Sequence, residues 1–250
     1  MGTINMNRLL NDIKAFCAQN SNPALVQKYS RFFVEGYDAY GVDQKILETQ
    51  RQFWLEEHRK ELGVDGFMAL GDLLVAGGKY EEVFLAFWFI KKFEKEFTKD
   101  TFTRLASWSE NGICNWAQSD TYSMDIISPF LLKQIVPLDR LSRWRYSPSK
   151  WMRRSVPVSL IKPAQQEIPV KDILDFIAPL MSDTEKVVHQ GLGWLLRELW
   201  KLHPGEVEAY LTEWKETCAR LIIQYATEKM TAENKLRFRR ITSKLKRTTQ

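Results

Sequence analysis

The sequence predicts an all-α protein, a curved solenoid built from pairs of helices. Apolar residues recur at helical spacing through most of the chain, and no long stretch alternates apolar and polar residues as a half-buried strand does. No Asn-Gly pair stands between two β-branched runs, so hairpin signals are missing too. The third observation is a repeat, in which a short helical segment is followed by a longer one. Together these features favour helices stacked on helices over a fold that contains a sheet.

The amino-terminal part of the chain predicts helices that cap the stack, at residues 5–19, 23–35 and 43–61. The first full pair begins with 64–78, in which Phe67, Leu70 and Leu74 fall at i, i+3 and i+7. This helix ends at Gly77-Gly78, and glycine can take the left-handed conformation that closes a helix. A longer helix over 80–97 follows at once.

Three more pairs follow the first one. They comprise 99–112 with 113–135, 137–148 with 149–162, and 169–183 with 184–205. The longer helices start about 34 to 36 residues apart, which is the signature of a HEAT-like solenoid. Pro157 should kink the third long helix. Helices at 206–226 and 231–246 should close the stack. Because no Pro-, Gly- or Ser-rich linker interrupts the chain, we expect one domain over 1–250, with 231–250 as a basic helix or tail.

Composition favours a soluble protein in the cytoplasm. Hydrophobic residues make up 44% of the chain and charged residues 27%. The apolar run 83–90 is far shorter than the roughly 20 residues that span a bilayer. Asp12 and Lys14 interrupt the stretch where a signal peptide would be apolar. We therefore expect no membrane partner, and we expect a monomer.

The sequence predicts no metal site, no cofactor and no disulfide framework. The cysteines are odd in number and far apart, and the histidines show no metal-ligand spacing. These residues are Cys17, Cys114, Cys218, His58, His189 and His203. The Gly191-x-Gly193 pattern lies within an expected helix, so close helix packing explains it better than a nucleotide-binding loop does.

Basic residues gather in two runs that contain no acid, although the net charge of the chain is only +5. The run over 140–154 also contains Trp144, Tyr146 and Trp151, and this mixture suits a polyanion such as nucleic acid. Its basic residues are Arg140, Arg143, Arg145, Lys150, Arg153 and Arg154. The second run, 235–247, fits a solvated basic tail at least as well.

Trp116 and Asp120 are four residues apart, so a helix places both on one face. Taken alone, the tryptophan would most often be a core residue and the aspartate a surface charge. The alternative is a site in which the carboxylate acts beside an aromatic wall. Asp125 is the rival carboxylate, and we interpret it as structural because it is rotated away from Trp116.

Three stretches of the chain resemble the DNA alkylation repair glycosylases of the AlkD type. They are "NWAQSDTYSMDIISPFL", "KWMRRSVPVSL" and "VVHQGLGWLLRELWKLHP", and the resemblance runs from the second expected helix to about residue 225. It implies an active site formed by Trp116, Asp120, Arg154 and Trp194. It also favours duplex DNA as the partner, with contacts from the basic run and Lys186. The chain departs from the best-known members at Asn115 and at Lys186-Val187, where they have aromatic residues.

The resemblance implies hydrolytic excision of purines alkylated at N3 or N7. Such a base is positively charged and leaves readily, so the site needs no general acid. Asp120 would stabilise positive charge that develops on the deoxyribose and orient the attacking water. Trp116 and Trp194 would offer their rings to the sugar and the cationic base, and Arg154 would hold a phosphate. Arg153 competes for that last role, since adjacent helix positions point about 100° apart.

Two other functions fit the same sequence. One is a non-catalytic HEAT-like module that binds structured or damaged nucleic acid. The other is a protein-interaction scaffold, in which the basic and aromatic run over 140–154 would be incidental.

Overall fold

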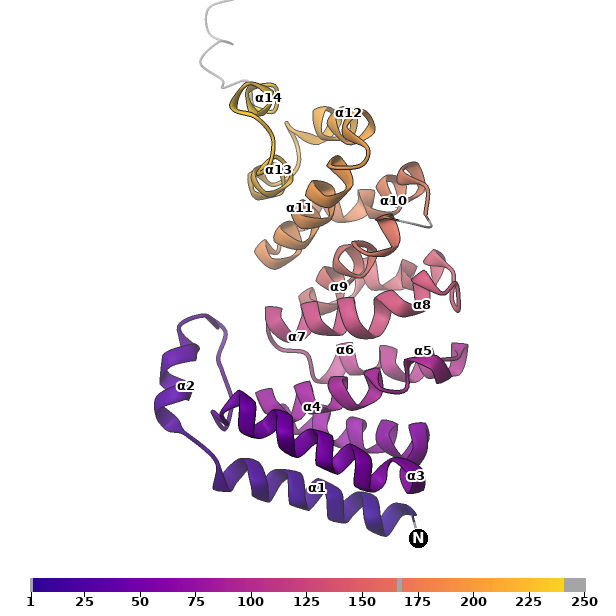
Figure 1. Cartoon of the computed structure of the whole chain (residues 1–250). Helices are drawn as coiled ribbons and strands as arrows, with labels where there is room; N and C mark the ends of the chain where they lie inside the picture. Colours follow the sequence, from indigo (N-terminus) through magenta and orange to yellow (C-terminus); the bar gives the residue numbers. More distant parts are fainter. Residues whose placement is uncertain (1, 166–167, 241–250) are drawn as a thin grey trace, which may run out of the picture. The chain divides into compact units, whose positions relative to one another are not determined.

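The computed structural model describes residues 2–165 and 168–240 of the chain, and those residues contain helices and no strand. The predicted all-α class is therefore confirmed (Figure 1). The chain divides into two compact units, Met1–Val136 and Pro137–Gln250. That residues 1–250 form one domain stays a prediction.

The first unit, Met1–Val136, is a stack of helices (Figure 1). Its segments are α1 (Gly2–Gln19), α2 (Pro23–Ser30), α3 (Gln44–Gly77), α4 (Tyr80–Lys91), η1 (Glu94–Glu96), α5 (Lys99–Ala106), α6 (Trp108–Asn111), α7 (Trp116–Thr121), η2 (Tyr122–Ile127) and α8 (Ser128–Leu132). The core lies between α3, α4 and the segment from α7 to α8. Its largest members are aromatic and are at most 2% exposed: Phe67, Phe87, Phe89, Phe93, Phe102, Tyr122 and Phe130.

The boundary expected between 43–61 and 64–78 is a kink inside α3. Gly63 has φ 56° and ψ −169°, outside the helical region, so the two expected helices meet there in one continuous element. The carboxyl end of α3 agrees with the prediction, because Gly78 closes it with φ 74°.

The helix expected over 23–35 is wrong in its second half. The structure ends α2 at Ser30, and none of its residues is buried. Phe32 and Phe33 donate their backbone N–H groups to the carbonyls three residues back, which tightens the last turn and leads into a loop. In that loop, residues 31–43, the aromatic residues follow a helical spacing although the backbone is not helical.

The helix expected over 113–135 contains a π-helical turn, η2, between α7 and α8. Ser128 donates its N–H to the carbonyl of Ser123, five residues back. The next residue is Pro129, which has no N–H to donate and whose ring crowds the carbonyl four residues earlier. A wider turn just before a proline relieves this crowding.

The second unit consists of shorter helices around one long central helix. Its segments are η3 (Leu138–Tyr146), α9 (Lys150–Leu160), η4 (Pro163–Gln165), α10 (Val170–Ile177), η5 (Ala178–Ser182), α11 (Lys186–Trp200), α12 (Pro204–Trp214), α13 (Arg220–Ala226) and α14 (Ala232–Leu236). The segment expected as a helix over 137–148 is the 3₁₀ helix η3, and the one expected over 206–226 is divided between α12 and α13. The part of the basic tail after residue 240 lies outside the described residues.

Two glycines of α11 allow the close helix packing that the sequence predicts. A Cβ at Gly191 would lie 3.3 Å from Pro157 Cγ and 3.4 Å from Arg154 Cγ, both on α9. A Cβ at Gly193 would lie 2.3 Å from Tyr225 Cβ and 2.9 Å from the carbonyl oxygen of Ile222, both on α13. The central helix therefore approaches one neighbour through each glycine.

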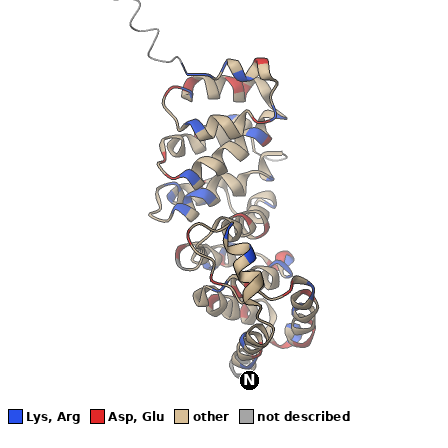
Figure 2. Cartoon of the chain, turned by 90° about the vertical axis from the view of Figure 1, so that its left-hand side faces the viewer, with Lys and Arg blue, Asp and Glu red and all other residues tan. Residues whose placement is uncertain are grey.

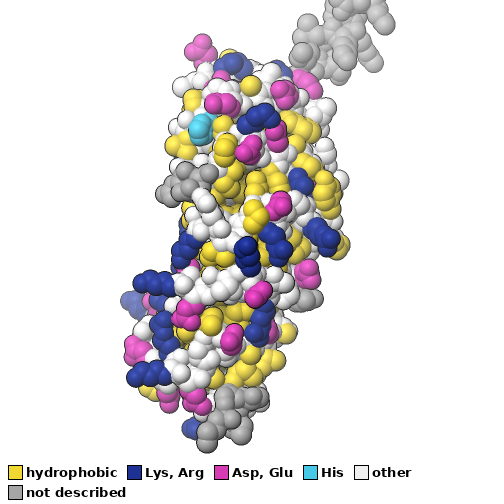
Figure 3. Space-filling view, turned by 90° about the vertical axis from the view of Figure 1, so that its right-hand side faces the viewer, with side chains coloured by type: hydrophobic (Ala, Val, Ile, Leu, Met, Phe, Trp, Pro, Cys, Tyr) yellow, Lys and Arg dark blue, Asp and Glu magenta, His cyan; other side chains and the backbone are white. Residues whose placement is uncertain are grey.

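Within the described ranges, no helix has the length and apolar character needed to cross a membrane. The same residues contain no group of three or more His, Cys, Asp or Glu side chains that could hold a metal ion. Figure 3 shows basic, acidic and apolar side chains mixed on the face that it presents.

Candidate functional site

The first half of the predicted site lies at the start of α7. Asn115 precedes the helix, and its side chain accepts the backbone N–H of Gln118 at 2.9 Å, which caps the helix. The residue that departs from the resemblance therefore has a structural role. Trp116 is the first helical residue and is 44% exposed, and Asp120, one turn later, is half-buried. The expectation that both residues belong to one helix is confirmed.

The indole of Trp116 is held by the loop that follows α2. Its Nε1 donates a hydrogen bond to the carbonyl oxygen of Phe32 at 3.0 Å. The ring of Phe33 stacks on it, with centroids 5.7 Å apart and an interplanar angle of 12°. Trp116 is therefore fixed in orientation although almost half of it faces solvent.

Asp125, the rival carboxylate, forms an ion pair with Lys91 of α4 at 2.7 Å. This contact ties the π-helical turn to the neighbouring helix and supports a structural interpretation of Asp125. The surrounding turn is also fixed, since Tyr122 is fully buried and donates its hydroxyl to the carbonyl of Leu105 at 2.8 Å.

The second half of the predicted site lies on α9 and α11 of the second unit. Arg154 is only 6% exposed, and its Nη1 donates to the carbonyl oxygen of Val187 at 2.5 Å. Trp194 lies two turns further along α11 and is half-buried. The structure thus places Arg154 and Trp194 on two adjacent, closely packed helices. That these residues act together with Trp116 and Asp120 stays a prediction.

Arg153 has a role that the sequence did not predict. Its guanidinium makes a two-point contact with Asp183, at 2.6 and 3.2 Å, and donates to the carbonyls of Ser147 and Pro148 at 2.7 and 3.2 Å. Both partners of the ion pair are largely shielded, with side chains 15% and 6% exposed. Arg153 therefore stabilises the loop before α9, and its predicted contact with DNA would require it to leave this network.

Arg145 is also engaged within its own unit. Its Nη1 donates to the carbonyl of Phe176 at 2.8 Å, and its guanidinium lies 4.3 Å from the centre of the Phe176 ring. The other predicted DNA contacts on this unit are exposed or half-buried. They are Arg140, Arg143, Lys150 and Lys186. Figure 2 marks the Lys and Arg positions of each unit in blue on the ribbon.

Asp183 is the residue in this unit that sequence analysis missed. Besides holding Arg153, it accepts the backbone N–H of Glu185 at 2.8 Å, and its carbonyl oxygen lies 2.5 Å from Nε2 of His189. The available signal was an aspartate three residues before the start of α11, where short acidic side chains often accept backbone N–H groups. His189 is 8% exposed and so does not lie on an open surface.

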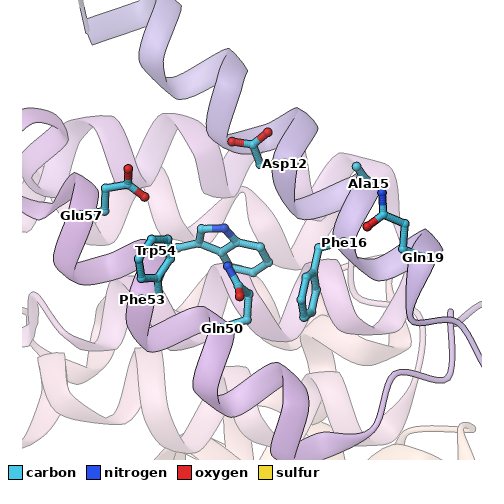
Figure 4. A pocket seen from close by; sticks show the side chains of 8 residues that line it. All are labelled: Asp12, Ala15, Phe16, Gln19, Gln50, Phe53, Trp54 and Glu57. Carbon is cyan, nitrogen blue, oxygen red and sulfur yellow. The ribbon is translucent and has the colours of Figure 1, made fainter.

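A pocket of about 300 Å³ in the first unit contains none of the predicted site residues. Its walls come from α1 and α3, and Figure 4 shows Trp54 across its centre with Phe16 and Phe53 beside it. The rings of Phe16 and Trp54 meet edge to face at 5.4 Å. This pocket is separate from the start of α7.

Comparison with known proteins establishes the family. The model of the family described as "DNA alkylation repair enzyme" matches residues 13–230. The chain belongs to this family. Among solved structures, the chain is similar to a protein from Enterococcus faecalis described as a predicted DNA alkylation repair enzyme, with 14% identity and a TM-score of 0.68. That match covers 85% of this chain and 98% of the other, and it shows a shared fold. No curated protein matches the sequence.

Family membership indicates DNA alkylation repair, with DNA as the substrate. It confirms the family resemblance that implies these site residues. The roles of Trp116, Asp120, Arg154 and Trp194 stay predictions.

Proposed function

We propose that this protein is a monofunctional DNA glycosylase, which hydrolyses the N-glycosidic bond of purines alkylated at N3 or N7. The observation that carries the proposal is the start of α7. There, an exposed indole with a fixed orientation stands one helical turn before a half-buried carboxylate. Membership of the DNA alkylation repair family supports DNA as the substrate.

The proposed reaction needs only modest help from the protein. As the bond between C1′ and the base nitrogen breaks, both electrons go to the base and neutralise its positive charge. The deoxyribose gains positive charge in the same step, and a water oxygen then bonds to C1′ and loses a proton. The products are a neutral free base and an abasic site. Because the base is already cationic, no side chain has to protonate it.

Asp120 is the proposed source of electrostatic stabilisation for the sugar. A carboxylate beside a developing positive charge lowers the barrier most when it is held in place before the reaction. Trp116 would contribute its exposed indole face, a contact worth roughly 0.5–2 kcal/mol with a cation. Trp194 has the same proposed role in the second unit.

Arg154 is the proposed phosphate contact. Its hydrogen bond to the carbonyl of Val187 orients the guanidinium, and because the side chain is 6% exposed, a planar, two-point contact with phosphate would require it to become more accessible. Arg140, Arg143, Lys150 and Lys186 are the proposed contacts along the rest of the backbone. Arg153 is proposed here only as a support for the loop before α9.

The test is release of free base from methylated duplex DNA under single-turnover conditions. The protein should release 3-methyladenine and 7-methylguanine, and Asp120→Asn should slow this by roughly 10²-fold, the scale of losing one preorganised electrostatic group. Duplex affinity should stay the same or rise, because a charge that repels phosphate is removed.

Asp125→Asn is the matched control on the same helical segment. Its ion pair with Lys91 is partly exposed and worth about 0–1 kcal/mol, so excision should continue at nearly the parental rate if the protein remains folded. Binding without any release of base would instead favour a non-catalytic DNA-binding module. Greater sensitivity at Asp125 than at Asp120 would show that Asp125 is the carboxylate that acts on the sugar.

A further inference from the structure

The loop between α2 and α3, residues 31–43, is hydrogen-bonded to two buried carboxylates of α4, since Tyr40 donates its hydroxyl to Glu82 at 2.7 Å and Glu81 accepts three backbone N–H groups. Glu81 is 5% exposed, and it accepts backbone N–H groups from Tyr40 at 2.9 Å, Gly41 at 2.7 Å and Val42 at 3.1 Å. Hydrogen bonds to an ionised acceptor are roughly twice as strong as those between neutral groups. Three of them on one side chain fix the carboxyl end of the loop.

The loop has little burial to hold it in place, because Gly41 is the only buried residue among residues 31–43. The helix before it, α2, has no buried residue, and Val34 in the loop is 99% exposed. Gly41 has φ +76°, and a Cβ there would lie 2.4 Å from the carbonyl oxygen of Asn22, so the chain passes too close for a side chain. The position of the loop therefore depends on polar contacts and on its aromatic rings.

Those rings form a continuous stack that ends at Trp116. Tyr37 stacks on Phe33 with centroids 4.6 Å apart and planes 9° apart, and Phe33 stacks on Trp116 at 5.7 Å and 12°. Tyr80, at the start of α4, meets the edges of Tyr37 and Phe33 at 5.0 and 5.7 Å. Burial raises the pKa of Tyr37 and of Tyr80, so both rings remain neutral phenols.

We infer that this loop is a positioning device for Trp116, with Phe33 and Glu81 as positioning residues. The inference rests on the proposed function, in which Trp116 presents its exposed face to the substrate. Trp116 is the first residue of its helix, so no preceding helical turn restricts its side chain. The stack of Phe33 and the hydrogen bond to the carbonyl of Phe32 supply that restriction from 83 and 84 residues away in sequence. Glu81 acts through the loop, since it touches neither the indole nor the substrate.

The test combines an excision assay with hydrogen exchange of the Trp116 indole N–H, followed by NMR of the ¹⁵N-labelled protein. The signal of Trp116 is identified by its loss in Trp116→Phe. In Phe33→Ala, exchange should be faster by about tenfold, the factor that a stacked aromatic pair contributes to an opening equilibrium. In Glu81→Gln, exchange should also be faster, because the loop that carries Phe33 loses hydrogen bonds to a carboxylate. Single-turnover excision should also fall by about tenfold, because the misplaced ring no longer meets the reacting sugar. Duplex affinity should stay within about threefold of the parent, since the loop is not proposed to contact phosphates.

Two controls separate positioning from general destabilisation. Phe33→Tyr keeps the stacked ring and should restore both the exchange and the excision rates. Phe53→Ala removes a ring of α3 that is 56% exposed, and it should leave both rates at the parental level. If Phe33→Ala loses its cooperative thermal unfolding, Phe33→Leu decides the matter, because it keeps most of the volume without the aromatic face.

Unchanged exchange in Phe33→Ala and Glu81→Gln would overturn the inference. So would faster exchange with undiminished excision. If the parent protein releases no base, the proposed function fails, and the exchange rates alone then decide whether the loop holds Trp116.

Discussion

Replacing Gly193 by alanine should force α11 and α13 apart. The added Cβ would lie 2.3 Å from Tyr225 Cβ and 2.9 Å from the carbonyl oxygen of Ile222. Neither atom can move by a change of side-chain rotamer, because one is a Cβ and the other belongs to the backbone. The helices themselves must shift, and Trp194, next in sequence to the substitution, must shift with them.

The expected loss of stability is the difference of two terms. Overpacking a close contact typically costs about 1–3 kcal/mol, and the contact at Gly193 is at the severe end of that range. Alanine in a helix interior returns about 1 kcal/mol relative to glycine. We therefore expect Gly193→Ala to lower the free energy of unfolding by about 2 kcal/mol, measured by urea denaturation.

Two glycines of the same unit are matched controls. At Gly191 the added Cβ would meet its neighbours at 3.3–3.4 Å, which small shifts can relieve, so the helix-propensity gain should offset the contact. At Gly205 nothing lies within 4 Å, and alanine should be neutral or stabilising. Equal stability of the Gly193 and Gly205 variants would refute the reasoning, because it would mean that α11 and α13 do not meet at this glycine.

Three further predictions concern single residues. Arg143→Glu should weaken duplex binding and reduce the slope of log affinity against log salt by about one or more, with no change in thermal unfolding, because Arg143 is exposed; salt titrations measured by fluorescence anisotropy check this. Asp183→Asn should lower the free energy of unfolding by about 3 kcal/mol in urea denaturation, because it leaves the shielded guanidinium of Arg153 without its carboxylate. Burial, with Glu81 and Glu82 nearby, raises the pKa of the Cys17 thiol from 9.0 to about 12. At pH 8, iodoacetamide should therefore modify the exposed Cys114 much faster than the buried Cys17 in the native protein. Peptide mass spectrometry distinguishes the two sites.

Helical periodicity predicted most of the secondary structure because the pattern of apolar residues is set by the packing of each helix. It was less informative where local geometry decides the outcome. The segment 137–148 has the right pattern but forms a 3₁₀ helix, whose hydrogen bonds differ by one residue from those of an α-helix. The helix expected over 23–35 includes residues 31–35, whereas the structure ends it at Ser30 and packs Phe33 against Trp116.

The sequence also predicted that Trp116 and Asp120 share a helix, since four residues make about one turn. It could not predict what holds Trp116, because Phe33 and Glu81 are brought to it only by the tertiary fold. The basic run shows the same limit. Six cations without an acid suggested an open basic surface, but the acid that neutralises Arg153 is Asp183, 30 residues away in sequence.

In each unit, packing orients one tryptophan that the proposed function uses. Trp116 is held by a ring stacked on one face and a hydrogen bond to its nitrogen, and the helix that carries Trp194 is fixed by glycine contacts with both neighbours. In each case the entropy of ordering the aromatic side chain is lost when the protein folds, so it is not lost again when a substrate binds.

Excision of a cationic base needs little proton transfer. Most of the remaining activation free energy therefore comes from the positive charge that develops on the sugar. A site that is rigid, aromatic and supplied with one carboxylate is suited to that charge, whereas a substrate with a neutral base would also need an acid. The proposed chemistry therefore predicts that the protein discriminates by the charge of the lesion, releasing 7-methylguanine but not the neutral base hypoxanthine from otherwise identical duplexes; equal release of both would contradict it.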